Sequence, residues 1–544
     1  MNKIYLFIAI MTLFWSCDAT DENSGDVTVD MRFTRFDVTL TSGEQSIGVI
    51  DEELSEIALY GIADPSEIRA VEYECTEGLT LITPTPESQI GDWSVTEKFT
   101  LHYGSSYRAY TVTLPDYAPV EPEYETQATI SPLDTFGCVT RFHMLDLNGD
   151  PDKASDASTA YAAFSEQGMN GIRFPLYCGD YYGGHPEEGV VVDSVYERPL
   201  ASLANAVRYY AGTEPFQIFL GIKCMTSDKN EYYPDWVSTE DDYIKPDKYA
   251  QMIIDFIAFM DEKGYEINAV AIDKENVRMD IEDFKESVDS IRAMAKRLGY
   301  TVPKIVAPEL LDPQGDVSSG WMNTLYDLGY EDRYDIFGNH YYQRDHTESG
   351  FAKLKYEYDL AQSDKARPQW ATEPHWNGNA DIYVAETAIG VMFDHTDLGL
   401  EAFMWWGYPI TGSSNYKNPI MRAYSQGILH SRPIRMIDHD GEETFTKGKL
   451  QSRAYLRGDE VNVFLINVVN VNYTDEIEPV SYEDYAIELL DNFSIDGKVT
   501  VRQWRDDTDY EGEVSLVSPV KDNQFLIDIP TGSFTQLTFN ISEE

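Results

Sequence analysis

The chain has 544 residues, too many for one ordinary hydrophobic core and enough for two or three domains. Hydrophobic residues make up 42% of it, so globular folding is expected and wholesale disorder is not. The formal net charge of −53, from 41 Lys and Arg against 94 Asp and Glu, argues against binding to nucleic acid or to anionic lipid headgroups. It also favours a neutral substrate over a polyanionic one, unless a local basic pocket overturns that preference.

The first residues have the composition of an export signal. Lys3 precedes an apolar run at 4–15, which is too short to span a bilayer comfortably and fits the core of a signal peptide. The run Leu13-Phe14-Trp15-Ser16-Cys17 resembles a bacterial lipobox, and the resemblance implies that Cys17 becomes a diacylated N-terminus. The acidic residues that follow suit a tether. We expect an outer-membrane surface protein held by its lipid alone; the alternative is a cleaved secretory signal with a chance cysteine.

Residues 27 to about 116 have the pattern of a small β-sandwich. Polar and apolar side chains alternate in short runs between turn residues, for example at 32–40 and 107–114. The Pro-rich and acidic stretch 115–122 is a reasonable linker. We expect this sandwich to be a spacer or a glycan-binding module.

From about residue 133, short apolar runs alternate with amphipathic helical stretches such as 249–260 and 281–298, which indicates βαβ units and a parallel sheet. Eight such units over roughly 300 residues match a (β/α)8 barrel. A doubly wound open sheet is the runner-up, but no GxGxxG opens any of the helices. The eight predicted strands are 136–141, 171–177, 217–224, 269–273, 304–308, 334–341, 369–372 and 402–406.

Beyond about residue 430 the pattern is that of β-strands again. Runs at 461–466, 499–504 and 534–539 predict a second sandwich, so the expected fold is an α/β (β/α)8 TIM barrel flanked by an N-terminal and a C-terminal β-sandwich. The predicted division is 1–16 signal peptide, 17–29 acidic tether, 30–116 N-terminal sandwich, 117–432 catalytic barrel and 433–544 C-terminal sandwich.

The ends of the predicted strands carry polar and aromatic side chains. Barrel enzymes place their chemistry at these carboxyl ends because the βα loops converge there. Two carboxylates on opposite sides of one mouth have the arrangement that a retaining glycosidase needs, one to protonate the leaving oxygen and one to attack the anomeric carbon. The alternative is that such glutamates are structural or bind a metal. The candidates are Arg173 in strand two, Glu275 after strand four, Glu309 after strand five, His340 and Tyr342 after strand six, Glu373 after strand seven, and Trp405 and Trp406 at strand eight.

These motifs resemble clan A of the glycoside hydrolases, and family 30 most closely. Trp370-Ala371-Thr372-Glu373 is similar to the family's Trp-x-Thr-Glu nucleophile motif, and Ile305-Val306-Ala307-Pro308-Glu309 and Phe337-Gly338-Asn339-His340-Tyr341-Tyr342 are similar to its strands five and six. The segment 425–433 resembles the one that joins the family's barrel to its side sandwich. The resemblance covers the chain from about residue 133 to the end. It implies a (β/α)8 barrel with Glu275 as acid/base and Glu373 as nucleophile.

The resemblance also implies roles for the neighbouring side chains. Arg173 would hold Glu373 ionised, and His340 or Tyr342 would hydrogen-bond near it. One of Trp405 and Trp406 would form the floor of the cleaved-sugar subsite, since alternation along a strand lets only one face inward. The family's usual Asn-Glu-Pro is replaced here, with Lys274 before Glu275 and Asn276 after it, so the contact to the sugar 2-hydroxyl must change. Lys274 and Asn276 are therefore candidate substrate-binding residues, and Glu309 is the reserve acid/base.

We therefore expect a retaining endo- or exo-glycosidase that acts on a polysaccharide or oligosaccharide as a monomer, without a cofactor. The rival is a non-catalytic surface glycan-binding lipoprotein on a decayed barrel, against which the presence of both Glu275 and Glu373 argues. A metal-dependent barrel hydrolase would need clustered ligands. The sequence offers His340 and scattered others, and its five cysteines lack metal-ligand spacing.

Overall fold

The computed structural model describes residues 30–79, 81–90, 96–103, 106–116, 124–179, 182–223, 233–239, 243–272, 279–309, 316–342, 348–376, 381–412, 414–438, 450–468 and 480–543. The chain forms two compact units, unit 1 at 1–123 and unit 2 at 124–544. Within the described ranges, no helix has the length and apolar composition needed to cross a membrane.

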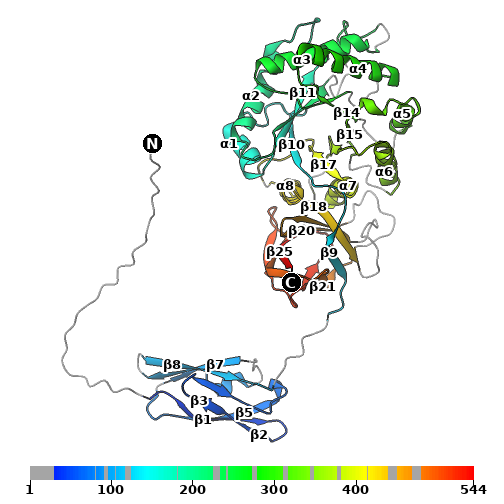
Figure 1. Ribbon diagram of the computed structural model, residues 1–544. Coiled ribbons are helices and arrows are strands. Elements are labelled where there is room, and N and C mark those ends of the chain that lie inside the picture. The colour runs from blue at the N-terminus through cyan, green and yellow to red at the C-terminus, as the bar shows by residue number, and fades with distance from the viewer. Residues whose placement is uncertain are drawn as a thin grey trace, which may run out of the picture. The chain divides into compact units, whose positions relative to one another are not determined.

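Unit 1 is a β-sandwich, as the alternating pattern predicts (Figure 1). Its strands are β1 (Phe33–Leu40), β2 (Gln45–Ile47), β3 (Val49–Asp51), β4 (Glu56–Ala58), β5 (Ile68–Cys75), β6 (Leu81–Thr83), β7 (Thr96–Tyr103) and β8 (Ser106–Thr113). One sheet has the order β2-β1-β5 and the other β3-β4-β8-β7-β6. Phe33 and Phe36 of β1 lie with their ring centroids 5.3 Å from Tyr110 and 5.6 Å from Phe99 of the other sheet. Aromatic packing between the two sheets therefore forms the core of this unit.

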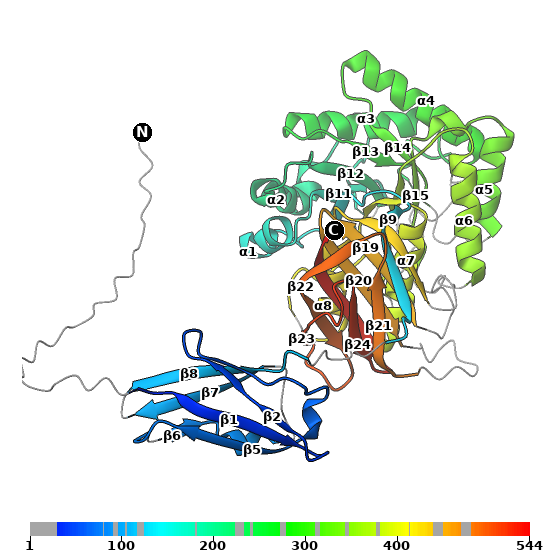
Figure 2. The same ribbon diagram turned by 60° about the horizontal axis from the view of Figure 1, so that its bottom comes forward.

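Unit 2 contains a closed barrel of parallel strands (Figures 1 and 2). The strands are β10 (Phe142–Asp146), β11 (Gly171–Tyr177), β12 (Gln217–Lys223), β13 (Ala269–Ala271), β14 (Lys304–Pro308), β15 (Ile336–Asn339), β16 (Gln369–Ala371) and β17 (Leu400–Phe403). Each strand pairs with the next, and β17 closes the ring on β10, where Phe142 lies opposite Ala402. The predicted (β/α)8 barrel is confirmed, and the open sheet is wrong.

Helices follow the strands around the outside of the barrel (Figure 2). They are α1 (Ala157–Tyr161), α2 (Asp193–Tyr209), α3 (Pro246–Glu262), α4 (Ile281–Leu298), α5 (Asp316–Asp327), α6 (Glu348–Gln362), α7 (Ala385–Asp397) and α8 (Lys417–Ile428). The ends of α4 show how local sequence fixes such a helix. The Asp280 carboxylate caps it by accepting a hydrogen bond from the backbone N–H of Asp283, and Gly299 ends it with φ 84°.

The first barrel strand differs from the prediction at 136–141. The observed β10 begins at Phe142, and the predicted segment instead leads into the barrel, with the Arg141 N–H donating to the Glu401 carbonyl at 2.8 Å. The sequence of β10 does not look like an apolar strand because it contains His143. Its buried ring stacks on Phe403 with centroids 4.3 Å apart, and burial lowers the pKa of His143 to about 3, so the strand carries a neutral ring.

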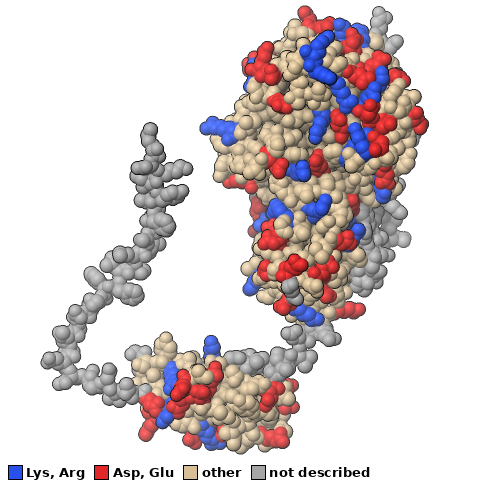
Figure 3. All heavy atoms as spheres, in the orientation of Figure 1, with Lys and Arg blue, Asp and Glu red and all other residues tan. Residues whose placement is uncertain are grey.

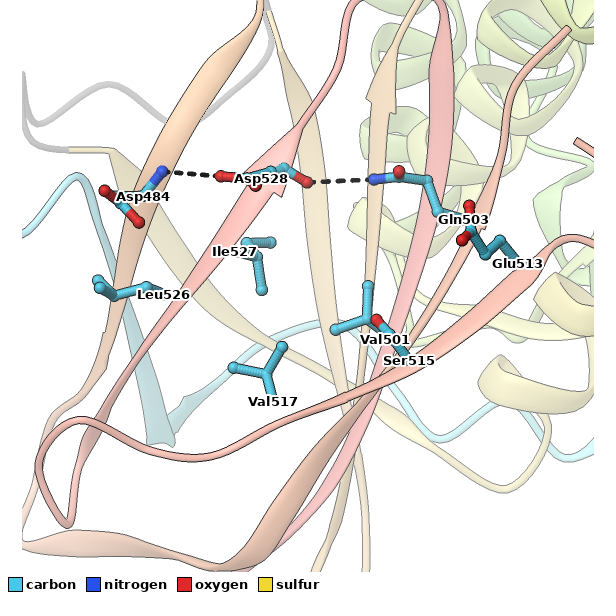
Figure 4. Close-up of a pocket in the computed structure, with 9 residues that line it drawn as sticks. All are labelled: Asp484, Val501, Gln503, Glu513, Ser515, Val517, Leu526, Ile527 and Asp528. Atoms are coloured by element: carbon cyan, nitrogen blue, oxygen red, sulfur yellow. Dashed lines mark hydrogen bonds between the residues drawn. The ribbon is translucent and has the colours of Figure 1, made fainter. Parts of the chain in front are cut away.

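The predicted C-terminal sandwich is a single sheet of nine strands that curls back on itself (Figure 4). They are β9 (Ala128–Thr135), β18 (Arg432–Asp438), β19 (Gln451–Arg457), β20 (Glu460–Asn467), β21 (Tyr482–Leu489), β22 (Phe493–Trp504), β23 (Glu513–Val517), β24 (Gln524–Ile529) and β25 (Ser533–Glu543), in the spatial order β23-β22-β25-β20-β19-β18-β9-β21-β24. The predicted division assigned 117–432 to the barrel, but β9 pairs here with β18 and β21, so Thr129 lies opposite Ile437. A partner some 300 residues away leaves no local signal in the sequence of β9.

Strands β19 and β20 rest on the barrel helices α7 and α8. The Phe464 ring lies 4.9 Å from the ring of Tyr424, and the Tyr455 hydroxyl lies 3.0 Å from the hydroxyl of Tyr424. Arg453 of β19 forms an ion pair with Asp397 of α7 at 2.7 Å. Barrel and sandwich therefore share one hydrophobic core, while a second core fills the other face of the sheet.

The sheet curls until its two edge strands, β23 and β24, approach each other (Figure 4). The Gln503 side-chain amide of β22 donates to the Asp528 carbonyl of β24 at 3.1 Å, and the Asp528 carboxylate accepts from the Asp484 N–H at 3.0 Å. A pocket of about 300 Å³ lies between the edges. Its lining mixes these polar groups with aliphatic side chains and includes no Lys, Arg or His, so it lacks the paired acid and cation found at the barrel mouth.

Candidate active site

Arg173 of β11 is fully buried inside the barrel and touches three carboxylates. Its Nη1 bonds Glu373 Oε2 and lies 3.6 Å from Asp146 Oδ2, and its Nη2 lies 3.3 Å from Glu309 Oε2. Burial by itself lowers the pKa of an arginine, but attraction to Glu373, Asp146 and Glu309 outweighs it, so the pKa of Arg173 is raised. A buried charge is stable when it is paired, so these four groups form one electrostatic unit.

A glycine in the neighbouring strand makes room for this arginine. A Cβ at Gly221 of β12 would lie 2.7 Å from Arg173 Nε and 2.7 Å from Asn148 Nδ2. Both distances are shorter than ordinary van der Waals contacts, so a larger residue would push one of the two side chains away. Gly221 therefore helps to set the position of Arg173.

Glu373 is held through both of its carboxylate oxygens and is 3% exposed. Oε1 accepts a hydrogen bond from the Tyr342 hydroxyl at 2.7 Å, while Oε2 accepts from Arg173 and lies 3.9 Å from His340 Nε2. The residue before it, Thr372, donates its N–H to the Asn339 carbonyl at 3.0 Å, which continues the pairing of β16 with β15. The predicted nucleophile thus stands at the end of a paired strand, with each carboxylate oxygen held by a hydrogen bond.

Glu309, directly after β14, is completely buried beside the same arginine. Its φ of 55° lies in the left-handed region that non-glycine residues rarely adopt, which turns the side chain inward. Its Oε2 lies 3.4 Å from His340 Nε2. A Cβ at Gly338 would lie 2.8 Å from Glu309 Oε1 and 2.3 Å from Val306 Cγ1, so only glycine leaves space for this carboxylate.

His340 and Tyr342, which follow β15, both belong to the site. The Tyr342 hydroxyl lies 3.4 Å from His340 Nδ1, so the tyrosine contacts both the histidine and Glu373. The sequence left open which of the two approaches the glutamate. The structure gives Tyr342 the short hydrogen bond and places His340 between Glu309 and Glu373.

The two tryptophans at the end of β17 point in different directions. Trp405 is fully buried and donates its ring N–H to the Ser425 hydroxyl of α8 at 3.0 Å, away from the mouth. Trp406 is half-buried, and a Cβ at Gly149 would lie 3.1 Å from its ring. The Nζ of Lys223 lies 5.2 Å from the centroid of the same ring. Trp406 is therefore the tryptophan that reaches the loops at the mouth.

Four of the predicted residues lie outside the described residues: Cys17, Lys274, Glu275 and Asn276. The structure describes the chain after β13 as far as Ile272, whose N–H donates to the Val306 carbonyl at 3.3 Å. The role of Glu275 as acid/base therefore stays a prediction.

Two residues of the site were not predicted from the sequence. Asp146, which contacts Arg173, was missed because strand one was predicted at 136–141; the correct strand ends on it. His375 was missed although it lies two residues after Glu373. Its ring centroid lies 6.1 Å from that of Tyr342. Burial lowers the pKa of His375 to about 4; Lys417 adds a smaller lowering, and Glu373 opposes the shift.

Metal ligands do not cluster in the part of the chain that the structure describes: no group of three or more His, Cys, Asp or Glu there is arranged to hold a metal ion. The carboxylates of Asp146, Glu309 and Glu373 instead surround the guanidinium of Arg173. This arrangement holds one oriented carboxylate, that of Glu373, at the carboxyl ends of the barrel strands.

No protein-family model matches the chain, and no curated protein matches it in sequence. Solved structures do match, and they define the class: the chain has the fold of the TIM-barrel glycoside hydrolases. The resemblance to family 30 that the motifs indicate is confirmed for the fold.

Three of these structures give the scale of the similarity. A family 30 endoxylanase from Clostridium papyrosolvens C71 is 14% identical with a TM-score of 0.52, and the match covers 76% of this chain and 100% of that one. CelM2, a bifunctional glucanase-xylanase from a metagenome library, is 13% identical with a TM-score of 0.51, covering 77% and 100%. An endo-β1,6-glucanase is 11% identical with a TM-score of 0.50, covering 82% and 100%. At these identities the likeness concerns the fold alone.

Proposed function

We propose that the protein is a retaining glycoside hydrolase that cleaves a polysaccharide or oligosaccharide with Glu373 as its nucleophile. The observation that carries the proposal is the fixation of Glu373 at the end of β16 by Arg173 and Tyr342. A nearby cation stabilises the ionised form of a carboxylate, which is the form that attacks. The three structural neighbours described above are named as an endoxylanase, a glucanase-xylanase and an endo-β1,6-glucanase, and these names support the same substrate class.

The reaction would proceed by two displacements. The Glu373 carboxylate attacks the anomeric carbon and forms a glycosyl ester, while an acid gives its proton to the leaving glycosidic oxygen. Water then attacks the same carbon, gives its proton to the conjugate base of that acid, and releases Glu373 as a carboxylate. Two inversions at one carbon retain its configuration.

We propose Glu275 as the acid/base because it follows β13 in the sequence, and β13 stands three strands away from β16, the strand that precedes Glu373. Glu309, the reserve candidate, is less suited to this role. Its side chain is fully enclosed, and one oxygen lies against both Arg173 and His340. A group in that position orients the arginine and the histidine, and it would have to move to reach a leaving group.

The experiment begins with a screen of the purified protein against plant, algal and fungal glycans, read by product chromatography. On the best substrate, Glu373→Gln should lower kcat by at least a thousandfold, and the wild-type product should first appear in NMR spectra with the anomeric configuration of the substrate. Glu401→Gln is the matched control, because the Glu401 carboxylate of β17 accepts a hydrogen bond from the Trp370 ring N–H of β16 at 3.0 Å and not from Arg173 or Tyr342. An inverted first product, or full activity in Glu373→Gln, would overturn the proposal.

The assignment of Glu275 is tested separately. Glu275→Ala should lose most activity on substrates with poor leaving groups and little on the glycosylation step with a good aryl leaving group, which needs no proton. Added azide should partly restore turnover by attacking the glycosyl ester in place of activated water. Equal losses on both substrate types, without rescue by azide, would move the role to Glu309 or favour a non-catalytic glycan-binding protein.

We further propose that Cys17 carries lipid and that the protein is displayed on the outer membrane. The support is the apolar run of signal-peptide length that ends at this cysteine and the acidic stretch that follows it. A polysaccharide hydrolase at the cell surface would meet its polymeric substrate before import.

A further inference from the structure

Three half-buried lysines lie at the end of β12, in the loop after β10 and at the start of α8. Lys223 ends β12 with its Nζ 5.2 Å from the Trp406 ring centroid. Lys153 follows β10, in the loop whose Gly149 packs against the same ring. Lys417 opens α8, and its Nζ donates to the Trp376 carbonyl at 3.2 Å.

This cluster is unfavourable for the protein on its own. Burial lowers the pKa of Lys153, although the nearby Asp150 and Asp146 partly oppose this shift. The pKa of Lys417 is lowered mainly by burial and, to a smaller extent, by repulsion from Lys153. The salt bridges between described residues include neither Lys153 nor Lys417. Lysine is a strongly hydrated point charge, so half-burying two of them within range of mutual repulsion costs free energy.

The cluster is also unexpected in a chain with a net charge of −53. On the face shown in Figure 3, acidic side chains are scattered among basic and uncharged ones. Asp and Glu outnumber Lys and Arg in the chain as a whole, 94 to 41. Lys153, Lys223 and Lys417 are nevertheless grouped near Trp406 and the segment that follows Glu373. A concentration of positive charge in a cleft attracts anionic ligands even when the protein as a whole is acidic.

Lys417 and Trp406 both contact the short segment that follows the proposed nucleophile, through Trp376 and His375 respectively. Trp406 pairs through its backbone with His375, two residues after Glu373, and His375 is acted on electrostatically by both Lys417 and Glu373. The sugar attached to Glu373 during the reaction would therefore rest near Trp406, with the lysine side chains around it.

We propose that this subsite takes a sugar that carries an anionic group, either a carboxylate or a sulfate ester, and that Lys153, Lys223 and Lys417 bind that group. The inference rests on the proposed function, since it assigns the glycone side of the same active site. It reverses the preference for a neutral substrate that the net charge predicts, through a local basic pocket.

The test uses the full chain with Glu373→Gln, so that bound glycans are not cleaved. Binding is measured to polygalacturonan, alginate and glucuronoxylan with their carboxyl-reduced forms, and to carrageenan and fucoidan with their desulfated forms. At least one acidic glycan should bind tenfold or more tightly than its neutralised form, and the identity of that pair distinguishes carboxylate from sulfate. Adding Lys153→Met and Lys417→Met together should weaken this binding by at least tenfold, because a charge-assisted hydrogen bond is worth about tenfold or more in affinity. Lys296→Met, an exposed lysine of α4, is the matched control and should change nothing.

Equal binding of acidic and neutralised glycans, or unchanged binding in the Lys153→Met, Lys417→Met protein, overturns the inference. Cleavage of the same panel by the wild-type protein separates this failure from failure of the proposed function. A neutral glycan that is cleaved while acidic ones are not supports the hydrolase and refutes the anionic subsite. An acidic glycan that binds through the lysines but is never cleaved supports the subsite and refutes the hydrolase. If nothing binds and nothing is cleaved, both are refuted.

Discussion

Substituting Gly221 with alanine changes the position of Arg173 without removing any charged group. The added Cβ would lie 2.7 Å from Arg173 Nε, where ordinary contacts begin near 3.4 Å. The arginine cannot yield easily, because Glu373, Glu309 and Asp146 hold its guanidinium. We expect a displacement of several tenths of an ångström, transmitted to the carboxylate of Glu373.

Two magnitudes follow for Gly221→Ala. Overpacking a filled interior costs about 1–3 kcal/mol, so the protein should fold with a lower Tm. A misplacement approaching 1 Å at a catalytic group costs roughly a hundredfold in rate, equivalent to about 2.7 kcal/mol. The expected result is a fall in kcat/KM of about 10- to 100-fold in a protein that remains folded.

Gly320→Ala provides the control for this experiment. Gly320 lies in α5 with nothing within 4 Å of the added Cβ, so alanine there should stabilise the helix by about 0.5–1 kcal/mol and leave kcat/KM unchanged. Activity is measured on the substrate found in the screen, and folding by circular dichroism and Tm. If the folded Gly221→Ala protein kept wild-type kcat/KM, the position of Arg173 would not govern Glu373, and this reasoning would fail.

Three further predictions concern other parts of the chain. Tyr342→Phe removes the 2.7 Å hydrogen bond to Glu373, a bond to a charged acceptor worth about 1.5–3 kcal/mol, so kcat/KM should fall about 10- to 100-fold; a loss below twofold would contradict this. The pKa of His143 is about 3 in the folded protein and 6.5 in the unfolded chain, so the unfolded chain binds the extra proton between these two pH values. The free energy of unfolding therefore keeps the full contribution of His143 above pH 6.5 and loses about 1.4 kcal/mol for each pH unit below it, down to about pH 3. His143→Phe should lose that share of the slope in urea unfolding between pH 4 and 6, and identical slopes would refute it. Cys17→Ala should move the protein from the membrane fraction to the soluble fraction and abolish labelling with palmitate, whereas unchanged fractionation and labelling would show that the anchor lies elsewhere.

The sequence by itself determined the class of fold and most members of the site. Strand and helix periods are local properties, so they revealed eight strand–helix units and two sandwich segments without any knowledge of contacts. The rule that barrel chemistry lies at the carboxyl ends of strands then selected Arg173, His340, Tyr342 and Glu373, which the structure brings together.

Tertiary structure alone decided what depends on partners far away in the chain. β9 pairs with a strand about 300 residues later, and β10 is defined by its neighbours β11 and β17, so neither could be placed from local pattern. Alternation allowed one tryptophan to face the mouth but did not say which; Ser425 on α8 holds Trp405 away from it. The meeting of Lys153, Lys223 and Lys417 around Trp406 was equally hidden, because net charge is a sum over the whole chain and a binding site depends on where a few charges converge.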